Sequence, residues 1–389
     1  TSAGMNMSEA FHNHSAFNED IENWDTSRVE NMELMFAGAI AFNQPIGNWS
    51  TSSVTNMYAM FSGASNFNQS LNNWDTSSVT DIEFMFHNAT SFNQPIGNWN
   101  TSNVTDMRSL FSGATSFNRN IENWNTSKVI YMQEMFIEAI NFDQPIGDWN
   151  VSEVTSLNRT FLNAKTFNQD INGWDTSNVT DMNGTFLGAL SFNHPLNNWS
   201  TSSVTNMYGM FNSASTFNEA IGYWDTSSVT DMGYMFENAE SFNQPIDSWD
   251  TANVIYFDGM FNNTSSFNQN VSNWNISDAI DMDQMFESTN LSGYNKRFIH
   301  EAFRVNPIWS YDWRKYIAVD DSEFTDAINL WFSDEANATA TYGHISDWNT
   351  SAVTNMYQAF LNRSSFNEDI GNWDVSSVTN MREMFKSAS

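Results

Sequence analysis

Carboxylates recur at two fixed places along this chain of 389 residues, and they are the first candidates for chemistry. In proteins, Ca²⁺ is bound by oxygen ligands. A cation that binds to a stack of carboxylates reduces the repulsion between them. Both columns alternate with Asn or Ser, which dilutes the charge. A solvated acidic surface is therefore favoured, and bound calcium is the alternative. The metal candidates are Asp75, Asp81, Asp106, Asp175, Asp181, Asp225 and Asp231.

Catalytic arrangements are absent from the sequence. The chain has no Cys, which excludes thiolate nucleophiles, thiolate metal sites and disulfides. The six His form no Ser-His-Asp pattern, and His12 and His14 are better explained as exposed loop residues than as half of a metal site. No carboxylate pair stands out for glycosidase chemistry, and no glycine-rich phosphate loop occurs. We predict no enzyme, no catalytic residues and no cofactor except possible calcium.

The charge balance restricts the partners. Lys and Arg number 14 against 45 Asp and Glu, a net charge of −31. Nucleic acid and anionic membranes are bound through Lys and Arg, so both are poor partners. No apolar run approaches the length that spans a bilayer.

Sequons for N-glycosylation are frequent, although the repeat itself dictates most of their Asn, Ser and Thr. Glycans are expected only if the protein is secreted by a eukaryote. The weak candidates are Asn48, Asn88, Asn103, Asn178 and Asn337.

The element that must position all these residues is a 25-residue repeat. Trp recurs at this interval from Trp24 to Trp274 and again at Trp348 and Trp373. One unit, starting at Thr51, reads TSSVTNMYAMFSGASNFNQSLNNWD. A unit of this size cannot enclose a core, whereas stacked units bury each apolar column against the same column of the next. The Trp and Phe columns are therefore predicted to be core rather than a sugar-binding platform.

The spacing within a unit predicts its local structure. Met57, Met60, Phe61 and Ala64 have the i, i+3, i+4, i+7 pattern of a short helix, and the segment 67–74 is predicted to be a strand. The Asn after each Phe (Asn43, Asn68, Asn93, Asn118) is predicted to form a ladder that satisfies backbone groups. Two Thr columns, typified by Thr51 and Thr55, leave a flat ice-binding array open as a remote alternative.

The skeleton S-V-T-N-M-x-x-M-F-x-x-A-x-x-F-N-Q-x-I-x-x-W-D resembles the repeat of BspA-like leucine-rich-repeat (LRR) surface proteins. The same repeat occurs in mycoplasma lipoproteins, lactic-acid bacteria and marine microbes. The resemblance covers about four fifths of the chain. It implies an α/β repeat solenoid, an LRR-like stack of coils with a short strand and a short helix each, on an extracellular surface. It brings no catalytic residues.

An interruption divides the array into three parts: a solenoid over 1–290, a helical cap or joint between modules over 291–344, and the start of the next solenoid over 345–389. The insert is predicted to contain helices over 295–305 and 322–332, with Ser322 as an N-cap. Its basic and aromatic residues are candidates for contacting a neighbouring acidic module, and packing within the cap is the alternative. These interface candidates are Lys296, Arg297, Arg304, Trp309, Trp313, Arg314, Lys315 and Trp331.

The first coil resembles the coil that follows the insert. Residues 1–25 and 350–374 are identical at 17 positions, and only these two coils contain Phe-Asn-Glu-Asp or an Ala-Phe in place of the usual Met-Phe. We therefore expect the sequence to be an excerpt from a longer tandem array of cap-plus-solenoid modules.

These observations favour a non-enzymatic extracellular structural protein, a module of a filament or giant surface protein that associates end to end. The alternative is a cell-surface adhesin that binds a host protein or glycan with one solenoid face.

Overall fold

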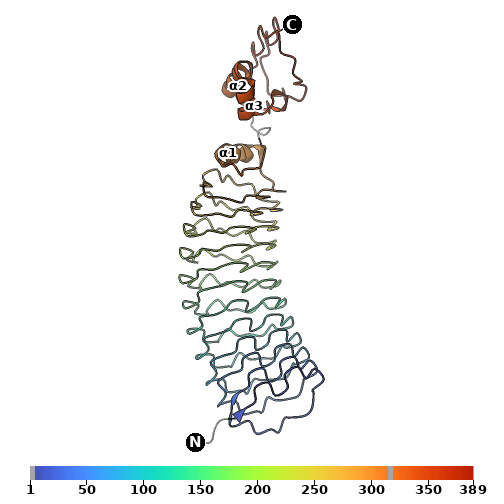
Figure 1. The fold of residues 1–389 in the computed structure, drawn as a ribbon, viewed down its shortest axis with the longest axis vertical. Coiled ribbons are helices and arrows are strands. Elements are labelled where there is room, and N and C mark those ends of the chain that lie inside the picture. Colours follow the sequence, from blue (N-terminus) through green and yellow to red (C-terminus); the bar gives the residue numbers. More distant parts are fainter. Residues whose placement is uncertain (1–4, 314–318, 389) are drawn as a thin grey trace. The chain divides into compact units, whose positions relative to one another are not determined.

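The computed structural model describes residues 5–313 and 319–388, which belong to two compact units. The first comprises Thr1–Phe267 and Trp274–Asn290, and the second comprises Asn268–Asn273 and Leu291–Ser389. Figure 1 shows the first unit as successive coils, and the helices belong to the second. The elements are β1 (Met5–Asn6), β2 (Val29–Asn31), α1 (Gly293–Phe303), α2 (Asp321–Ser333), α3 (Glu335–Tyr342) and the 3-10 helix η2 (Ile345–Asp347).

Neighbouring coils of the first unit are joined by a ladder of parallel backbone hydrogen bonds. The N–H of Met57 donates to the carbonyl oxygen of Asp81 at 3.0 Å, and the N–H of Phe61 donates to that of Met85 at 2.9 Å. We number each coil from the residue equivalent to Thr51. Single parallel bridges then connect position 6 of successive coils, as between Asp81 and Asp106. The predicted strand over 67–74 is wrong, because the extended pairing lies at positions 5 to 13 instead.

The predicted helix in each coil is also wrong, because two tight turns occupy its place. The N–H of Met60 donates to the carbonyl of Met57 at 3.2 Å, and the N–H of Ala64 donates to that of Phe61 at 3.0 Å. Ala59 has φ of +49° and Gly63 has φ of +69°, and left-handed residues interrupt an α-helix. Successive four-residue β-turns bury the same four positions as a helix would, so the periodicity could not separate the two structures.

Aromatic columns form the core of the stack, as predicted. Trp124 is 3% exposed and lies parallel to Trp99, with ring centroids 6.3 Å apart. Its Nε1 donates to the buried carbonyl of Ile96 at 3.0 Å. Each coil adds a Phe pair, such as Phe111 and Phe117 at 4.0 Å. The columns therefore continue from coil to coil, which buries indoles that a single coil would leave in water.

The predicted Asn ladder is confirmed. The Oδ1 of Asn43 accepts the backbone N–H of Asn68 at 3.0 Å, and the Oδ1 of Asn68 accepts that of Asn93 at 3.0 Å. Asp143 takes the same role toward Asn168 at 2.9 Å. The ladder thus needs an Oδ1 acceptor and is satisfied by an amide or a carboxylate.

The Thr columns do not form an open array. Thr51 is 1% exposed and donates its hydroxyl to the carbonyl oxygen of Asp75 at 2.9 Å. Thr80, in the second column, is exposed but donates to the carbonyl oxygen of Thr55 at 3.2 Å. The first column is therefore part of the core, and it cannot present hydroxyls to ice.

The second unit contains both predicted helices of the insert, as α1 and α2. The N-cap of α2 is Asp320, however, and the predicted cap Ser322 is wrong. The Asp320 carboxylate accepts the N–H groups of Ser322 and Glu323, both at 2.9 Å, and the Glu323 side chain returns toward the Asp320 N–H. This capping box begins the helix two residues earlier than Ser322 could.

Candidate functional site

The best-defined site is the place where α2 covers the first coil of the second stack. The Asp321 carboxylate accepts the N–H groups of Thr354 at 2.6 Å and Asn355 at 2.9 Å, and the Thr354 hydroxyl at 2.5 Å. In the regular array a carbonyl of the preceding coil fills this role, as Thr55 does for Thr80. Asp321 thus takes the place of the carbonyl group that a preceding coil would supply. The hydrogen bond from the Thr354 hydroxyl lowers the pKa of the Asp321 carboxyl below its ordinary value.

Aromatic side chains of α2 complete the cover. Phe324 meets Trp373 edge to face at 5.5 Å. Phe332 meets Phe360 at 6.2 Å and Phe366 at 5.9 Å. Trp373 is 7% exposed as a result, close to the Trp residues of the first unit. Sequence analysis missed these contact residues of α2, because they lie in the non-repeating insert and touch residues more than 25 positions away.

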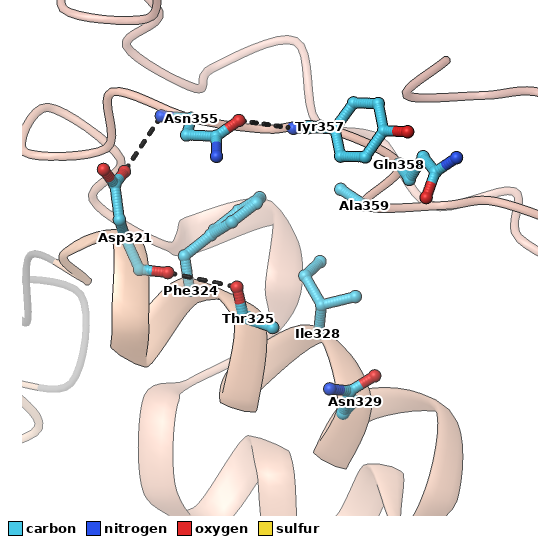
Figure 2. A pocket seen from close by; sticks show the side chains of 9 residues that line it. All are labelled: Asp321, Phe324, Thr325, Ile328, Asn329, Asn355, Tyr357, Gln358 and Ala359. Atoms are coloured by element: carbon cyan, nitrogen blue, oxygen red, sulfur yellow. Dashed lines mark hydrogen bonds between the residues drawn. The ribbon is translucent and has the colours of Figure 1, made fainter. Parts of the chain in front are cut away.

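A pocket of about 120 Å³ remains between α2 and this coil (Figure 2). Its only carboxylate, Asp321, already accepts three hydrogen bonds from Thr354 and Asn355. The lining therefore offers no second carboxylate for acid–base chemistry. The lining residues are Asp321, Phe324, Thr325, Ile328, Asn329, Asn355, Tyr357, Gln358 and Ala359.

Three charged interface candidates of the insert, Lys296, Arg297 and Arg304, lie on or directly after α1. Arg297 forms ion pairs with Glu323 of α2 and, at 3.3 Å, with Glu301. The Lys296 ammonium lies 5.9 Å from the Trp313 ring. Arg304 follows α1 and is exposed. Arg314 and Lys315 lie outside the described residues.

The three tryptophans of the insert serve mainly as packing groups. Trp313 is 7% exposed and meets Trp309 edge to face at 5.3 Å. Trp309 is half-buried and donates from Nε1 to Nδ1 of His300 at 3.0 Å. Trp331 is 5% exposed and meets Trp348 at 6.1 Å. Packing within the cap, the alternative left open by the sequence, therefore applies to Trp313 and Trp331.

The two acidic columns have a structural use in the coil turns. At position 25, the Oδ1 of Asp225 accepts both the N–H and the hydroxyl of Ser227, at 3.0 and 2.6 Å. At position 6, the Oδ1 of Asp231 accepts the N–H of Gly233 at 2.9 Å. Asp75 and Asp175 repeat the first arrangement, and Asp81, Asp106 and Asp181 the second. Within residues 5–313 and 319–388, no three acidic or His side chains gather as a metal site would require.

The columns differ in electrostatics. Hydrogen bonds from Ser227 lower the pKa of Asp225, whereas burial raises the pKa of Asp231. Burial also raises the pKa of Asp81, and the neighbouring Asp106 adds to this rise. Position 6 is therefore a partly buried line of acids, and position 25 is an exposed line.

Tyr208 and Tyr234 lie beside the position 6 column, and Tyr256 belongs to it. Tyr208 and Tyr234 meet edge to face at 5.6 Å, and Tyr208 and Tyr256 are 38% and 41% exposed. Burial raises the pKa of Tyr234, and the neighbouring Asp258 adds to the rise. This acidic aromatic group on three successive coils is the most distinctive feature of the lateral surface.

The sequon residues Asn48, Asn88, Asn103, Asn178 and Asn337 are all exposed. Two of them donate from the side-chain amide to a backbone carbonyl of the preceding coil. Asn103 donates to the carbonyl of Ser77 at 2.9 Å, and Asn178 donates to that of Ser152 at 2.7 Å. A glycan on either nitrogen would compete with this hydrogen bond.

Comparison with known proteins gives a family assignment. The family model described as "Mycoplasma protein of unknown function, DUF285" matches residues 5–119, 94–199, 186–297 and 323–389. A crystal structure of a TLR13–ssRNA13 complex is similar over 68% of this chain and 46% of that chain, with 9% identity and a TM-score of 0.21. This chain thus spans less than half the length of that chain, and the score is too low to establish a shared fold. No curated protein matches significantly. No helix in the described part of the chain has the length and hydrophobicity of a membrane span.

Proposed function

The chain belongs to the DUF285 family, and from this premise we propose that it is a non-enzymatic structural module of an extracellular filament or giant surface protein. The module consists of an LRR-like solenoid of the BspA-like type followed by a helical cap, and modules associate end to end. The family is described only as mycoplasma proteins of unknown function, so the role is argued from the site.

The observation that carries the proposal is the cover of the second stack by α2. Asp321 and Phe324 occupy the place of a preceding coil, and Thr350 then begins a new stack with the same repeat. Stack, cap and stack in one chain are the order that a tandem array requires. The family model matches 323–389 separately from 186–297, and this match includes most of α2 together with the coils that follow it.

Charge and burial support a structural role. Apolar surface is used almost entirely inside the stack, and the net charge of −31 discourages lateral association of neighbouring molecules. Trp24 in the first coil is 41% exposed, and isolated apolar residues such as Ile40 and Ile280 are exposed on the flanks. Association through the Trp24 face would bury apolar surface, whereas lateral association would also bring acids together.

Sedimentation velocity over a range of concentrations tests end-to-end association. We expect the sedimentation coefficient of the chain to rise with concentration, and Trp24→Ala to weaken this rise because it removes apolar area at the coil end. Tyr223→Ala is the matched control, since Tyr223 is 79% exposed on a coil flank. A chain that stays monomeric throughout contradicts the proposal, as does a loss caused only by Tyr223→Ala.

The tyrosine group of the flank favours an adhesin as the second candidate. Tyr208, Tyr234 and Tyr256 present aromatic surface beside acids that can accept hydrogen bonds, and such surfaces bind sugars or basic peptides. Immobilised glycans and host surface proteins, each tested with the chain and its Tyr208→Ala/Tyr256→Ala variant, distinguish this role. Binding that the variant loses would support the adhesin.

A further inference from the structure

The first coil of the first unit presents an apolar face that the structure leaves open. Trp24 is 41% exposed, whereas Trp49 and Trp74 in the same column are 3% and 4% exposed. In the next coil, the Trp49 indole N–H donates to the Ile21 carbonyl of the first coil at 3.2 Å. Phe11 and Phe17 are half-exposed on the same face, stacked at 3.8 Å.

A second coil of almost the same sequence shows what covers such a face. Residues 350–374 match 1–25 at 17 of 25 positions, so that Trp373, Phe360 and Phe366 correspond to Trp24, Phe11 and Phe17. Those three residues are the ones that Phe324 and Phe332 of α2 contact.

Two departures from the repeat, found only in these coils, lie beside cap residues. The first is Ala359, which replaces the usual Met and lines the pocket beside α2. The second is Glu368 of Phe-Asn-Glu-Asp, whose carboxylate lies 3.6 Å from Nε2 of His344. Ala10 and Glu19 are the corresponding residues of the first coil. Regular coils, which meet another coil instead of a cap, have neither feature.

We propose that the face of residues 5–25 is the docking surface for a helical cap with the sequence of residues 319–349, as the coil of residues 350–374 is for the cap in this chain. Phe324 and Phe332 of the docked cap cover Trp24, Phe11 and Phe17, and its His344 faces Glu19. This inference rests on the proposed function in one respect, namely that modules follow one another in an array.

Thiol labelling tests the proposal, because the chain contains no Cys. The full chain is extended by placing a copy of its residues 291–349 directly before Thr1, and Ala10→Cys is introduced. Ala10 is exposed, whereas its counterpart Ala359 is half-buried under the cap. Ala16→Cys is the matched control, since Ala16 and its counterpart Ser365 are both exposed.

At a concentration where the chain is monomeric, we expect the extension to slow labelling of A10C by about tenfold and to leave A16C unchanged, because a docked cap must open before the thiol reacts. Phe324→Ala and Phe332→Ala in the added copy should restore the fast rate. Equal rates for A10C with and without the extension overturn the proposal, provided that circular dichroism shows the added helices folded. Protection that survives both Phe substitutions overturns it as well. Neither result depends on whether filaments form.

Discussion

At the scale of single residues, Asn and Asp replace one another in three columns, because each column requires only the Oδ1 atom as a hydrogen-bond acceptor. Oδ1 accepts the N–H two residues ahead at positions 6 and 25, and in the ladder it accepts the N–H of the next coil. The ladder could be predicted because Asn is uncommon inside a repeat unless its amide is bonded. The turn role of the Asp columns was not predicted, because a column of acids indicates cation binding equally well.

The two Asp columns should respond to pH with opposite sign. Burial raises the folded-state pKa of Asp231, so its contribution to stability is lost as pH rises through that pKa. Hydrogen bonds from Ser227 lower the pKa of Asp225, so its contribution is present at neutral pH and lost as pH falls.

We expect Asp231→Asn to raise the melting temperature at pH 7 and Asp225→Asn to lower it slightly, with both differences vanishing well below the ordinary carboxyl pKa of 3.8. Asn206, one coil before Asp231, makes the same turn bond to Tyr208 at 3.0 Å, so Asn is compatible with the site. Thermal unfolding followed by circular dichroism checks this. The same sign for both variants at pH 7 would contradict the assignment.

At the scale of elements, the sequence predicted which residues are buried better than it predicted the path of the chain. Met57, Met60, Phe61 and Ala64 are all fully buried, as expected. Turns with a left-handed residue, however, repeat the burial pattern of a helix, and most of the left-handed positions carry ordinary residues such as Ala59 or Glu134 instead of Gly. The first turn therefore carried no local signal, whereas the second has Gly or Asn at its left-handed position in most coils, as at Gly63 and Asn88, which could have marked it.

Each buried tryptophan of the column should stabilise the stack in two ways, through the apolar area that it buries and through its indole hydrogen bond. Trp124→Ala leaves a cavity and should cost about 3–5 kcal/mol of unfolding free energy. Trp124→Phe keeps an aromatic ring but leaves the Ile96 carbonyl without its donor, which should cost about 1–3 kcal/mol. Chemical denaturation, with hydrogen exchange to locate the change, measures both. Equal losses for the two variants would show that the buried ring contributes nothing beyond its hydrogen bond, and an unchanged stability of Trp124→Phe would show that the indole N–H contributes nothing.

At the scale of the whole molecule, repetition made the stack predictable and the cap only partly so. The insert was recognised because Trp spacing fails there, and its helices because they are amphipathic. The role of Asp321 was not predicted, because its partners Thr354 and Asn355 lie more than 30 residues away outside the repeat. Two sequence features shared by coils 1–25 and 350–374 could have located the contact. They are the Ala-Phe that replaces Met-Phe and the segment Phe-Asn-Glu-Asp.

A stack in which coils contact only their neighbours should tolerate the loss of complete coils. Excision of residues 101–150 joins Asn100 to Val151, which keeps both the 25-residue register and the alternation of Pro-containing coils. We expect a folded protein with a native-like spectrum and slightly reduced stability. Excision of 101–112, which shifts the register, should give an unfolded or aggregated product. Similar behaviour of the two deletions would contradict the stacked arrangement.

The central claim, that this chain is a structural module that assembles end to end, is tested most directly by negative-stain electron microscopy of the native material with and without a calcium chelator. We predict long fibres with a regular axial repeat. Loss of the fibres on chelation would assign the acidic columns a role in binding calcium. Discrete short particles at every concentration, in both conditions, would contradict the claim and favour an adhesin that displays one binding face.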